Sequence, residues 1–289
     1  MLNATENPTV ALQGLLDSRF AQRTLKLDGC QQAVREAGDG PVIVLLHGIG
    51  SGAASWLEVA LQLSQGARVI AWDAPGYGDS TPLAPAAPTA EDYAARLLQT
   101  LDALNIERCV LVGHSLGAIT AAAFSQLYPQ RVNRLVLLSP ARGYGDPARE
   151  TQRLQVRAKR LHSLETLGIP AMAEQRSSHM LSTRASAKAL AWVRWNMARL
   201  NHQGYRQAIE LLCGDDLLRH TPLSVPCEVH CGEADSITTP ETCHSLAKAL
   251  GVSFTLIPDA GHASPIEQPY VVAGRLAFAV QQSMTGSAQ

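Results

Sequence analysis

Short apolar runs recur along the chain and alternate with longer segments of helical periodicity. The run Val42–Leu46 reads VIVLL and is apolar at every position, which is the pattern of a buried strand covered on both faces. Two runs nearer the N-terminus, Thr24–Leu27 and Gln31–Glu36, alternate apolar and polar residues and predict a pair of edge strands. Five further apolar runs predict strands: Val69–Trp72, Cys109–Val112, Leu135–Leu138, Cys227–His230 and Ser253–Ile257.

Helical patterns lie between these runs. Thr89 and Asp92 have the spacing of a capping box at the start of one of them. Because strands and helices alternate, the sequence predicts an α/β fold, with a mostly parallel central sheet and helices on both faces. The segments with helical periodicity are Ala53–Ser64, Thr89–Leu104, Leu116–Tyr128, Pro240–Leu250 and Glu267–Gln282.

One long insert interrupts the alternation. Residues 147–221 contain no convincing strand, but Arg149–Leu161 and Ala185–Leu200 have helical patterns. The shorter stretch Leu83–Pro88 is rich in Pro and Ala and predicts a loop. We expect the insert to lie over the C-terminal ends of the strands, which is where ligands bind in open α/β folds.

Composition and charge exclude several classes of protein. The 289 residues carry 24 Lys and Arg against 25 Asp and Glu, a net charge of −1, whereas nucleic-acid-binding proteins usually have a basic excess. No apolar run approaches the ~20 residues of a membrane-spanning helix, and the N-terminus lacks the pattern of a secretory signal. Six cysteines are few for this length, so we expect a cytoplasmic protein.

The charge is unevenly distributed along the chain. Residues 141–222 hold 13 Lys and Arg against 7 Asp and Glu, whereas the rest of the chain holds 11 against 18. A basic insert of this kind suits an anionic small-molecule substrate. The alternative is that the basic insert simply docks on the acidic body.

The strongest chemical signal is the segment Gly113-His114-Ser115-Leu116-Gly117. It follows a predicted strand and precedes a predicted helix, which is the context of a nucleophile elbow. Glycines on both sides of Ser115 leave room for a tight turn, and the start of a helix favours developing negative charge. We therefore predict that Ser115 is a nucleophile; the alternative is a turn serine that caps its helix.

A glycine-rich loop, His47-Gly48-Ile49-Gly50, follows the strand Val42–Leu46. Acyl transfer passes through an oxyanion that fixed N–H donors stabilise. The candidate donors are the backbone N–H groups of Ile49 and Leu116, the latter directly after the nucleophile. No Gly-Lys-Ser/Thr follows, which disfavours a phosphate-binding P-loop, whereas a purely structural glycine loop stays open.

A base and its orienting acid are predicted near the C-terminus. His262 follows the last predicted strand, and histidine is the residue suited to accept a serine proton near neutral pH. Asp235 follows the preceding strand and is a better candidate than Glu233, which is two residues nearer that strand. The order Ser115, Asp235, His262 is that of α/β hydrolases. The alternatives are a loop aspartate and a surface or core histidine.

Taken together, these motifs make the chain resemble the α/β-hydrolase superfamily over nearly its whole length. The matching segments are HGIGSG, DAPGYGDS, GHSLGA, GEADSIT and GHASPIEQP. The resemblance implies a helical cap, here residues 143–222, inserted between two parts of the hydrolase core, residues 1–142 and 223–289. Haloalkane dehalogenases and epoxide hydrolases of this fold use aspartate as nucleophile, so a serine at position 115 disfavours both.

A weaker similarity points to a substrate class. The cap residues Gly204-Tyr205-Arg206-Gln207-Ala208 and Gly214-Asp215-Asp216-Leu217 are similar to the end of the cap in 3-oxoadipate enol-lactonases, which act on small carboxylated lactones. Carbon–carbon hydrolases of ring-cleavage pathways share the Ser/Asp/His set and the cap. Many of those carry a tryptophan after the catalytic histidine, where this chain has Ala263.

Two residues are candidate substrate contacts. Arg142 follows the predicted strand Leu135–Leu138 and could bind a carboxylate through two hydrogen bonds. Trp195 shares a helical face with Trp192 and could form a wall of the pocket. The alternatives are a solvated arginine and a tryptophan pair that packs in the core.

No metal site is predicted. Cys227 and Cys231 share a face of a predicted strand but lie ~13 Å apart along it at ~3.3 Å per residue, too far to ligate one zinc ion. We therefore predict buried, apolar cysteines.

The sequence predicts a serine hydrolase that cleaves a small carboxylic ester or lactone through an acyl-enzyme, with no metal and no cofactor. Its partner is a small-molecule substrate, with no nucleic acid and no membrane, and a homo-oligomer is compatible with the sequence. The alternatives are a carbon–carbon bond hydrolase and a ligand-binding homologue without catalytic activity.

Overall fold

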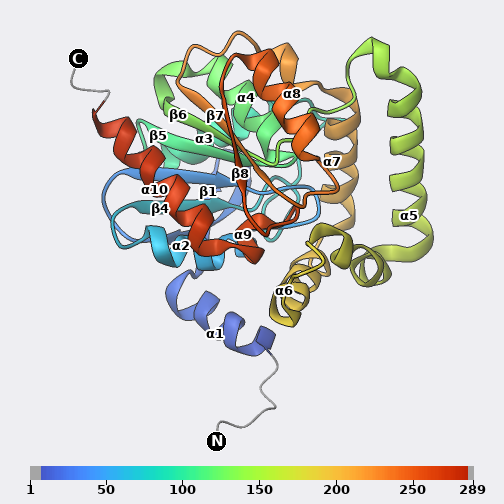
Figure 1. Ribbon diagram of the computed structural model, residues 1–289, viewed down its shortest axis with the longest axis horizontal. Coiled ribbons are helices and arrows are strands. Elements are labelled where there is room, and N and C mark those ends of the chain that lie inside the picture. Colours follow the sequence, from blue (N-terminus) through green and yellow to red (C-terminus); the bar gives the residue numbers. More distant parts are fainter. Residues whose placement is uncertain (1–7, 286–289) are drawn as a thin grey trace, which may run out of the picture.

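The computed structural model describes residues 8–285, which form an eight-stranded sheet with helices on both faces (Figure 1). The strand order is β1-β2-β4-β3-β5-β6-β7-β8. The pairs β1–β2 and β2–β4 are antiparallel, and the other five pairs are parallel. The strands are β1 (Gln22–Leu27), β2 (Cys30–Ala37), β3 (Val42–Leu46), β4 (Arg68–Trp72), β5 (Cys109–His114), β6 (Val132–Leu138), β7 (Cys227–Gly232) and β8 (Ser253–Ile257).

The predicted strands are therefore present, with one correction to their placement. Of the pair predicted as edge strands, only β1 lies at the edge. β2 pairs with β1 on one side and with β4 on the other. Ala33 and Val34 of β2 are fully buried, as expected for an inner strand. The polar residues at the start of β2 had instead suggested an edge strand.

Adjacent residues of the central strands pack into different layers. Val44 and Leu46 of β3 pack in one hydrophobic cluster, whereas Ile43 and Leu45 pack in another. Because successive side chains of a strand point to opposite faces, the all-apolar run VIVLL supplies both layers. The first layer contains α3 (Ala90–Ala103), α4 (Gly117–Leu127) and α8 (Pro240–Leu250), and the second contains α2 (Leu57–Leu63) and α10 (Pro269–Thr285). The short helix α9 (Ser264–Glu267) precedes α10.

The predicted capping box is confirmed at the start of α3. The Thr89 side chain accepts a hydrogen bond from the Asp92 N–H at 3.3 Å, and the Asp92 carboxylate accepts one from the Thr89 N–H at 2.8 Å. Both donors would otherwise lack a partner at the helix start.

A long helical insertion lies between β6 and β7, as the sequence predicted. It contains α5 (Glu150–Arg176), α6 (Ala187–Met197) and α7 (His202–Gly214). The helix α5 runs well beyond the predicted end at Leu161, with a break at Gly168, whose φ is 70° and ψ is 170°. Figure 1 shows α5 at the outer edge of the molecule, with α7 between it and the sheet.

Among residues 8–285, three α-helices were not predicted from the sequence pattern: α1 (Pro8–Arg19), α7 and the four-residue helix α9. The helix α1 contributes Leu12 and Leu16 to the second layer, a spacing of one turn that gives only a short apolar stripe. The helix α7 has Gly204 in its first turn and is capped by the Asn201 side chain. Glycine has a low helix propensity, which weakened the pattern there.

The insertion is joined to the sheet and its covering helices by polar contacts. Lys188 of α6 pairs with Glu58 of α2 at 2.6 Å, and Arg184 pairs with Asp259. Gln207 of α7 donates to the carbonyl of Leu83 at 2.7 Å. Two basic residues of the insertion thus dock on acidic residues of the body. Within residues 8–285, no helix is long and apolar enough to cross a membrane.

Candidate active site

Ser115 stands in a strained turn between β5 and α4. Its φ is 53°, in the left-handed region that costs energy for residues with a side chain. The turn tolerates only glycine nearby: a Cβ at Gly117 would lie 2.6 Å from the carbonyl oxygen of Leu46, and one at Gly113 would lie 2.6 Å from the Cα of Ala118. The glycines of the sequence motif therefore allow the backbone to present Ser115 at the head of α4.

The structure brings together the three predicted members of a triad. The Ser115 hydroxyl donates to His262 Nε2 at 2.9 Å, and His262 Nδ1 donates to Asp235 Oδ2 at 2.9 Å. The other Asp235 oxygen accepts the N–H groups of Ile237 at 2.8 Å and Thr238 at 3.0 Å. In this arrangement His262 Nε2 can accept the serine proton.

The environment of Asp235 keeps it ionised. Burial alone would raise the pKa of this carboxyl group, but the positive charge that His262 can carry and the hydrogen bonds from His262 and the Ile237 N–H hold the pKa below its ordinary value. An ionised Asp235 stabilises an imidazolium at His262. The acid is thus set up for orientation rather than for proton transfer.

The loop that carries His262 is held by residues that the sequence analysis did not single out. The Gly261 N–H donates to Glu267 at 2.9 Å, and the Ala263 N–H donates to the carbonyl of Met180 at 2.8 Å. His114 Nε2 donates to the carbonyl of His262 at 2.8 Å. Since Met180 belongs to the insertion, the insertion helps to position the histidine.

The two predicted oxyanion donors lie at the cavity beside Ser115. Ile49 and Leu116 both line that cavity, and neither backbone N–H has an acceptor among residues 8–285. Tyr77 donates its hydroxyl to the Ile49 carbonyl at 2.9 Å, which fixes the Ile49–Gly50 peptide. Unpaired backbone donors are costly when buried, so this pair is available for a ligand oxygen.

His47 stabilises the glycine-rich loop that contains Ile49. Its Nε2 accepts the Ala74 N–H at 2.9 Å, and its Nδ1 donates to the Gly48 carbonyl at 2.8 Å. The loop also needs a glycine at position 48, because a Cβ there would lie 2.8 Å from the Cβ of Ser115. These contacts place the loop directly against the nucleophile.

A cavity of about 610 Å³ opens beside Ser115 and His262. Arg142 lines it, but its guanidinium is already engaged: Nη2 lies 2.7 Å from Asp216 Oδ2 and 2.6 Å from Asp146 Oδ2. Trp195 does not line the cavity that the described residues form; it stacks on Trp192 with 4.4 Å between the ring centroids. Of the two predicted substrate contacts, Arg142 thus lies at the cavity but is already paired, and Trp195 is not among the described residues that line it.

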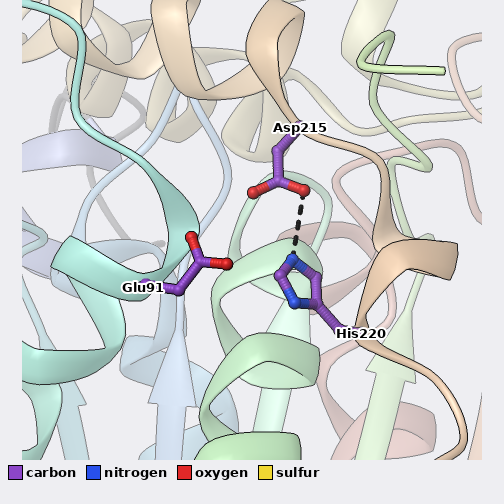
Figure 2. A group of neighbouring side chains, drawn as sticks. All are labelled: Glu91, Asp215 and His220. Carbon is purple, nitrogen blue, oxygen red and sulfur yellow. Dashed lines mark hydrogen bonds and ion pairs between the residues drawn. The ribbon is translucent and has the colours of Figure 1, made fainter. Parts of the chain in front are cut away.

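A second polar cluster lies where the end of the insertion meets α3 (Figure 2), and the Ala90 N–H donates to Asp215 there at 3.4 Å. Asp215 accepts His220 Nε2 at 3.1 Å and the Asp216 N–H at 2.7 Å, and Glu91 faces this pair. Burial would raise the pKa of Asp215, but the hydrogen bond and charge of His220 hold it below its ordinary value. The three ligand atoms lie within 4.8 Å of one another, close enough for a metal ion, but the protein's own donors already satisfy Asp215.

Acidification is expected to destabilise the protein through His114. Burial first, and next the positive charge that His262 can carry, lower the pKa of His114 to about 3. A histidine in the unfolded chain titrates near 6.5. Between these values the unfolded state binds more protons, so the free energy of unfolding falls with falling pH, by about 1.4 kcal/mol per pH unit for one such proton.

The measurement is denaturant unfolding at about pH 7, 6 and 5 for wild type and His114→Gln. Glutamine keeps an N–H donor for the His262 carbonyl but does not titrate. The variant should therefore lose less stability per pH unit than wild type. Equal slopes for the two proteins would contradict the assignment of the acid sensitivity to His114.

Comparison with known proteins shows structures with a similar fold. The chain is 25% identical to a thermophilic esterase from Thermogutta terrifontis, solved with malate bound, over 91% of this chain and 98% of that one, with a TM-score of 0.79. It is 26% identical to an enol-lactonase from Burkholderia xenovorans LB400 over 91% of this chain and all of that one, with a TM-score of 0.75.

Curated relatives match over shorter stretches. A 2-hydroxy-6-oxononadienedioate/2-hydroxy-6-oxononatrienedioate hydrolase from Pseudomonas putida is 34% identical over 145 residues, 48% of this chain and 50% of that protein. The chain matches between 32% and 50% of the length of such relatives. The family described as alpha/beta hydrolase fold matches residues 41–269. The chain belongs to the α/β hydrolase fold family.

Proposed function

We propose that this α/β hydrolase is a serine hydrolase that cleaves a small carboxylic ester or lactone. The observation that carries the proposal is the continuous hydrogen-bond chain Ser115–His262–Asp235, with 2.9 Å at each step. It ends at a cavity that also receives the free N–H groups of Ile49 and Leu116. A nucleophile, a base and oxyanion donors around one cavity are the parts that acyl transfer requires.

The chemistry follows from these positions. The Ser115 oxygen attacks the ester carbonyl while His262 Nε2 takes its proton, and the two backbone N–H groups stabilise the oxyanion. The C–O bond to the leaving group breaks, and the His262 imidazolium protonates the leaving oxygen. Water then attacks the acyl-enzyme with His262 as base, which releases the acid and restores the serine.

The preference for an ester or a lactone is supported by the structural relatives. An esterase and an enol-lactonase match nine-tenths of this chain at 25% and 26% identity. In a lactone, the leaving oxygen stays attached to the acyl group, so the same triad opens a ring without releasing an alcohol. Both substrates need the same reacting atoms.

A second candidate is carbon–carbon bond hydrolysis. The Pseudomonas putida relative is named as a dienedioate hydrolase, and its reaction would use the same nucleophile and base. The position after His262 is Ala263 in this chain, which differs from the tryptophan common in carbon–carbon hydrolases. A panel that contains esters, lactones and vinylogous diketones separates the two candidates.

The test is intact mass spectrometry after incubation with a fluorophosphonate. We expect a single adduct on wild type and on Ser125→Ala, and none on Ser115→Ala. Ser125 is the matched control, because it is a buried serine of α4 whose hydroxyl donates to the Ala121 carbonyl of its own helix. A folded wild type without an adduct would overturn the serine-hydrolase proposal and favour a ligand-binding role.

A further inference from the structure

The insertion forms one wall of the cavity, and this wall is strongly cationic. Four arginines line the cavity: Arg142, Arg149, Arg160 and Arg176. Arg160 belongs to the part of α5 before the break at Gly168, which Figure 1 shows at the outer edge of the molecule, and Arg176 ends the part after that break. Ser115 and His262 line the same cavity from the side of the sheet. A substrate in the cavity therefore lies between the triad and the α5 wall.

Two of the four guanidinium groups are neutralised or engaged by the protein itself. Arg142 pairs with Asp216 and Asp146. Arg149 donates to the Gly143 carbonyl and lies over the Tyr144 ring, 4.5 Å from its centroid. These two arginines hold the start of the insertion in place and are already occupied.

Arg160 and Arg176 have no carboxylate partner among the described residues. Arg160 donates to the hydroxyl of Tyr205 at 3.2 Å, a neutral group, and Arg176 forms no ion pair within residues 8–285. This absence stands out because other arginines of the insertion are paired. Arg157, one turn before Arg160 on α5, binds Glu210 through two hydrogen bonds of 2.8 and 2.7 Å.

The two unpaired cations are close enough to affect each other. Burial first, and next the positive charge of Arg160, lower the pKa of Arg176. Arg176 ends α5, where the helix dipole supplies a partial negative charge, but Arg160 lies well inside the helix and gains nothing from it. Two partly buried like charges without a counter-ion are unfavourable, so an anion between them would be stabilising.

The rest of the wall is largely apolar. Met172, Met180 and Met197 line the cavity together with leucines, and thioether side chains adapt to flexible hydrocarbon groups. One carboxylate, that of Glu241, is among the lining residues, and it is exposed at the start of α8. The cavity thus combines a reactive serine, an apolar middle and a cationic wall.

We propose that Arg160 and Arg176 together bind a carboxylate of the substrate, so that the substrate class is an acid ester or lactone with a free carboxylate separated from the reacting carbonyl by an apolar linker. This inference rests on the proposed serine-hydrolase function. Guanidinium groups suit the site because each offers two parallel donors to a carboxylate. Arg160 and Arg176 take the role that the sequence suggested for Arg142.

The first experiment compares matched ester pairs. One member is the para-nitrophenyl monoester of glutaric, adipic or pimelic acid, and the other replaces its free carboxylate with an isosteric isopropyl group. For at least one chain length, wild type should have a kcat/KM about tenfold or more higher for the acid. Arg160→Gln and Arg176→Gln should lower kcat/KM for that acid by about 10- to 100-fold, mainly through KM, and change it less than about threefold for the neutral ester.

Arg157→Gln is the matched control. It removes a charge from the same helix and breaks a surface ion pair, but Arg157 does not line the cavity. Its preference for the acid should equal that of wild type. If no chain length shows a preference for the acid, or if the Arg176→Gln loss is equal for both esters, the carboxylate site is overturned while the ester hydrolysis stands.

A binding measurement separates this inference from the proposed function. In Ser115→Ala, which cannot form an acyl-enzyme, monomethyl adipate should bind more tightly than dimethyl adipate by calorimetry, and the added change Arg176→Gln should weaken monomethyl adipate at least about tenfold. This result would support the carboxylate site even if wild type hydrolysed no ester and formed no fluorophosphonate adduct. Equal binding of the monoester and the diester would overturn the site.

Discussion

Replacing Ser115 with alanine is expected to reduce kcat for ester hydrolysis by a factor on the order of 10⁵. The hydroxyl forms the single covalent intermediate of the proposed reaction, and its one hydrogen bond among residues 8–285 is the one to His262. Alanine keeps the Cβ and meets the same backbone strain at φ 53°, so the turn should fold. Initial rates with a chromogenic ester, measured alongside circular dichroism, test this expectation.

The dependence between Ser115 and His262 provides a stricter test. The two residues act as one unit. The kcat of the double variant Ser115→Ala/His262→Ala should therefore lie within a few-fold of the kcat of each single variant. Ser125→Ala should retain wild-type rates. If the losses of the single variants multiply in the double variant, the two residues do not act in one proton-transfer step.

The sheet and the triad could be predicted because their signals are local. Each central strand buries both faces, so it reads as an unbroken apolar run such as VIVLL in β3. The elbow depends on glycines, since Gly113 and Gly117 have no room for a Cβ. Strand ends then determine where Asp235 and His262 fall. His262 reaches Ser115, and Asp235 reaches His262, as the chain order suggested.

The basic character of the insertion could be predicted, but the unpaired arginines of the cationic wall could not, because pairing joins residues that are distant in the sequence. Arg142 looked free in the sequence, yet its partner Asp216 lies 74 positions further along the chain. Arg157 and Arg160 are equivalent in sequence terms, but Glu210 of α7 reaches only the first of them. Which arginines stay unpaired is therefore decided by how α5 and α7 pack.

The full length of α5 and the position of Trp195 could not be predicted from the sequence for a different reason. Gly168 and Pro170 lie inside α5 and break its helical pattern, yet the chain continues as helix to Arg176. Periodicity placed Trp192 and Trp195 on one face, but it could not show which side of that face meets the cavity. Trp195 instead stacks on Trp192, and the guanidinium carbon of Arg199 lies over the Trp195 ring, 3.7 Å from its centroid.

Asp235→Asn is expected to lower kcat by a factor on the order of 10³ to 10⁴ near neutral pH. The amide oxygen can still accept the N–H groups of Ile237 and Thr238, so the fold should persist. Its NH₂ group would face His262 Nδ1 and donate to it. That hydrogen bond favours the tautomer with the proton on Nε2, which cannot accept the proton of Ser115.

Glu233→Gln is the matched control for this change, because Glu233 follows the same strand two residues earlier and contacts the Asp259 N–H at 3.4 Å instead of His262. Its kcat should stay within about threefold of wild type, since it removes an equal charge outside the triad. The fluorophosphonate reaction of Asp235→Asn should slow in parallel with kcat, because both depend on proton transfer from Ser115. If Asp235→Asn kept its activity while Glu233→Gln lost it, the acid that orients His262 would be Glu233, and the hydrogen bond from His262 to Asp235 would serve only to hold the loop.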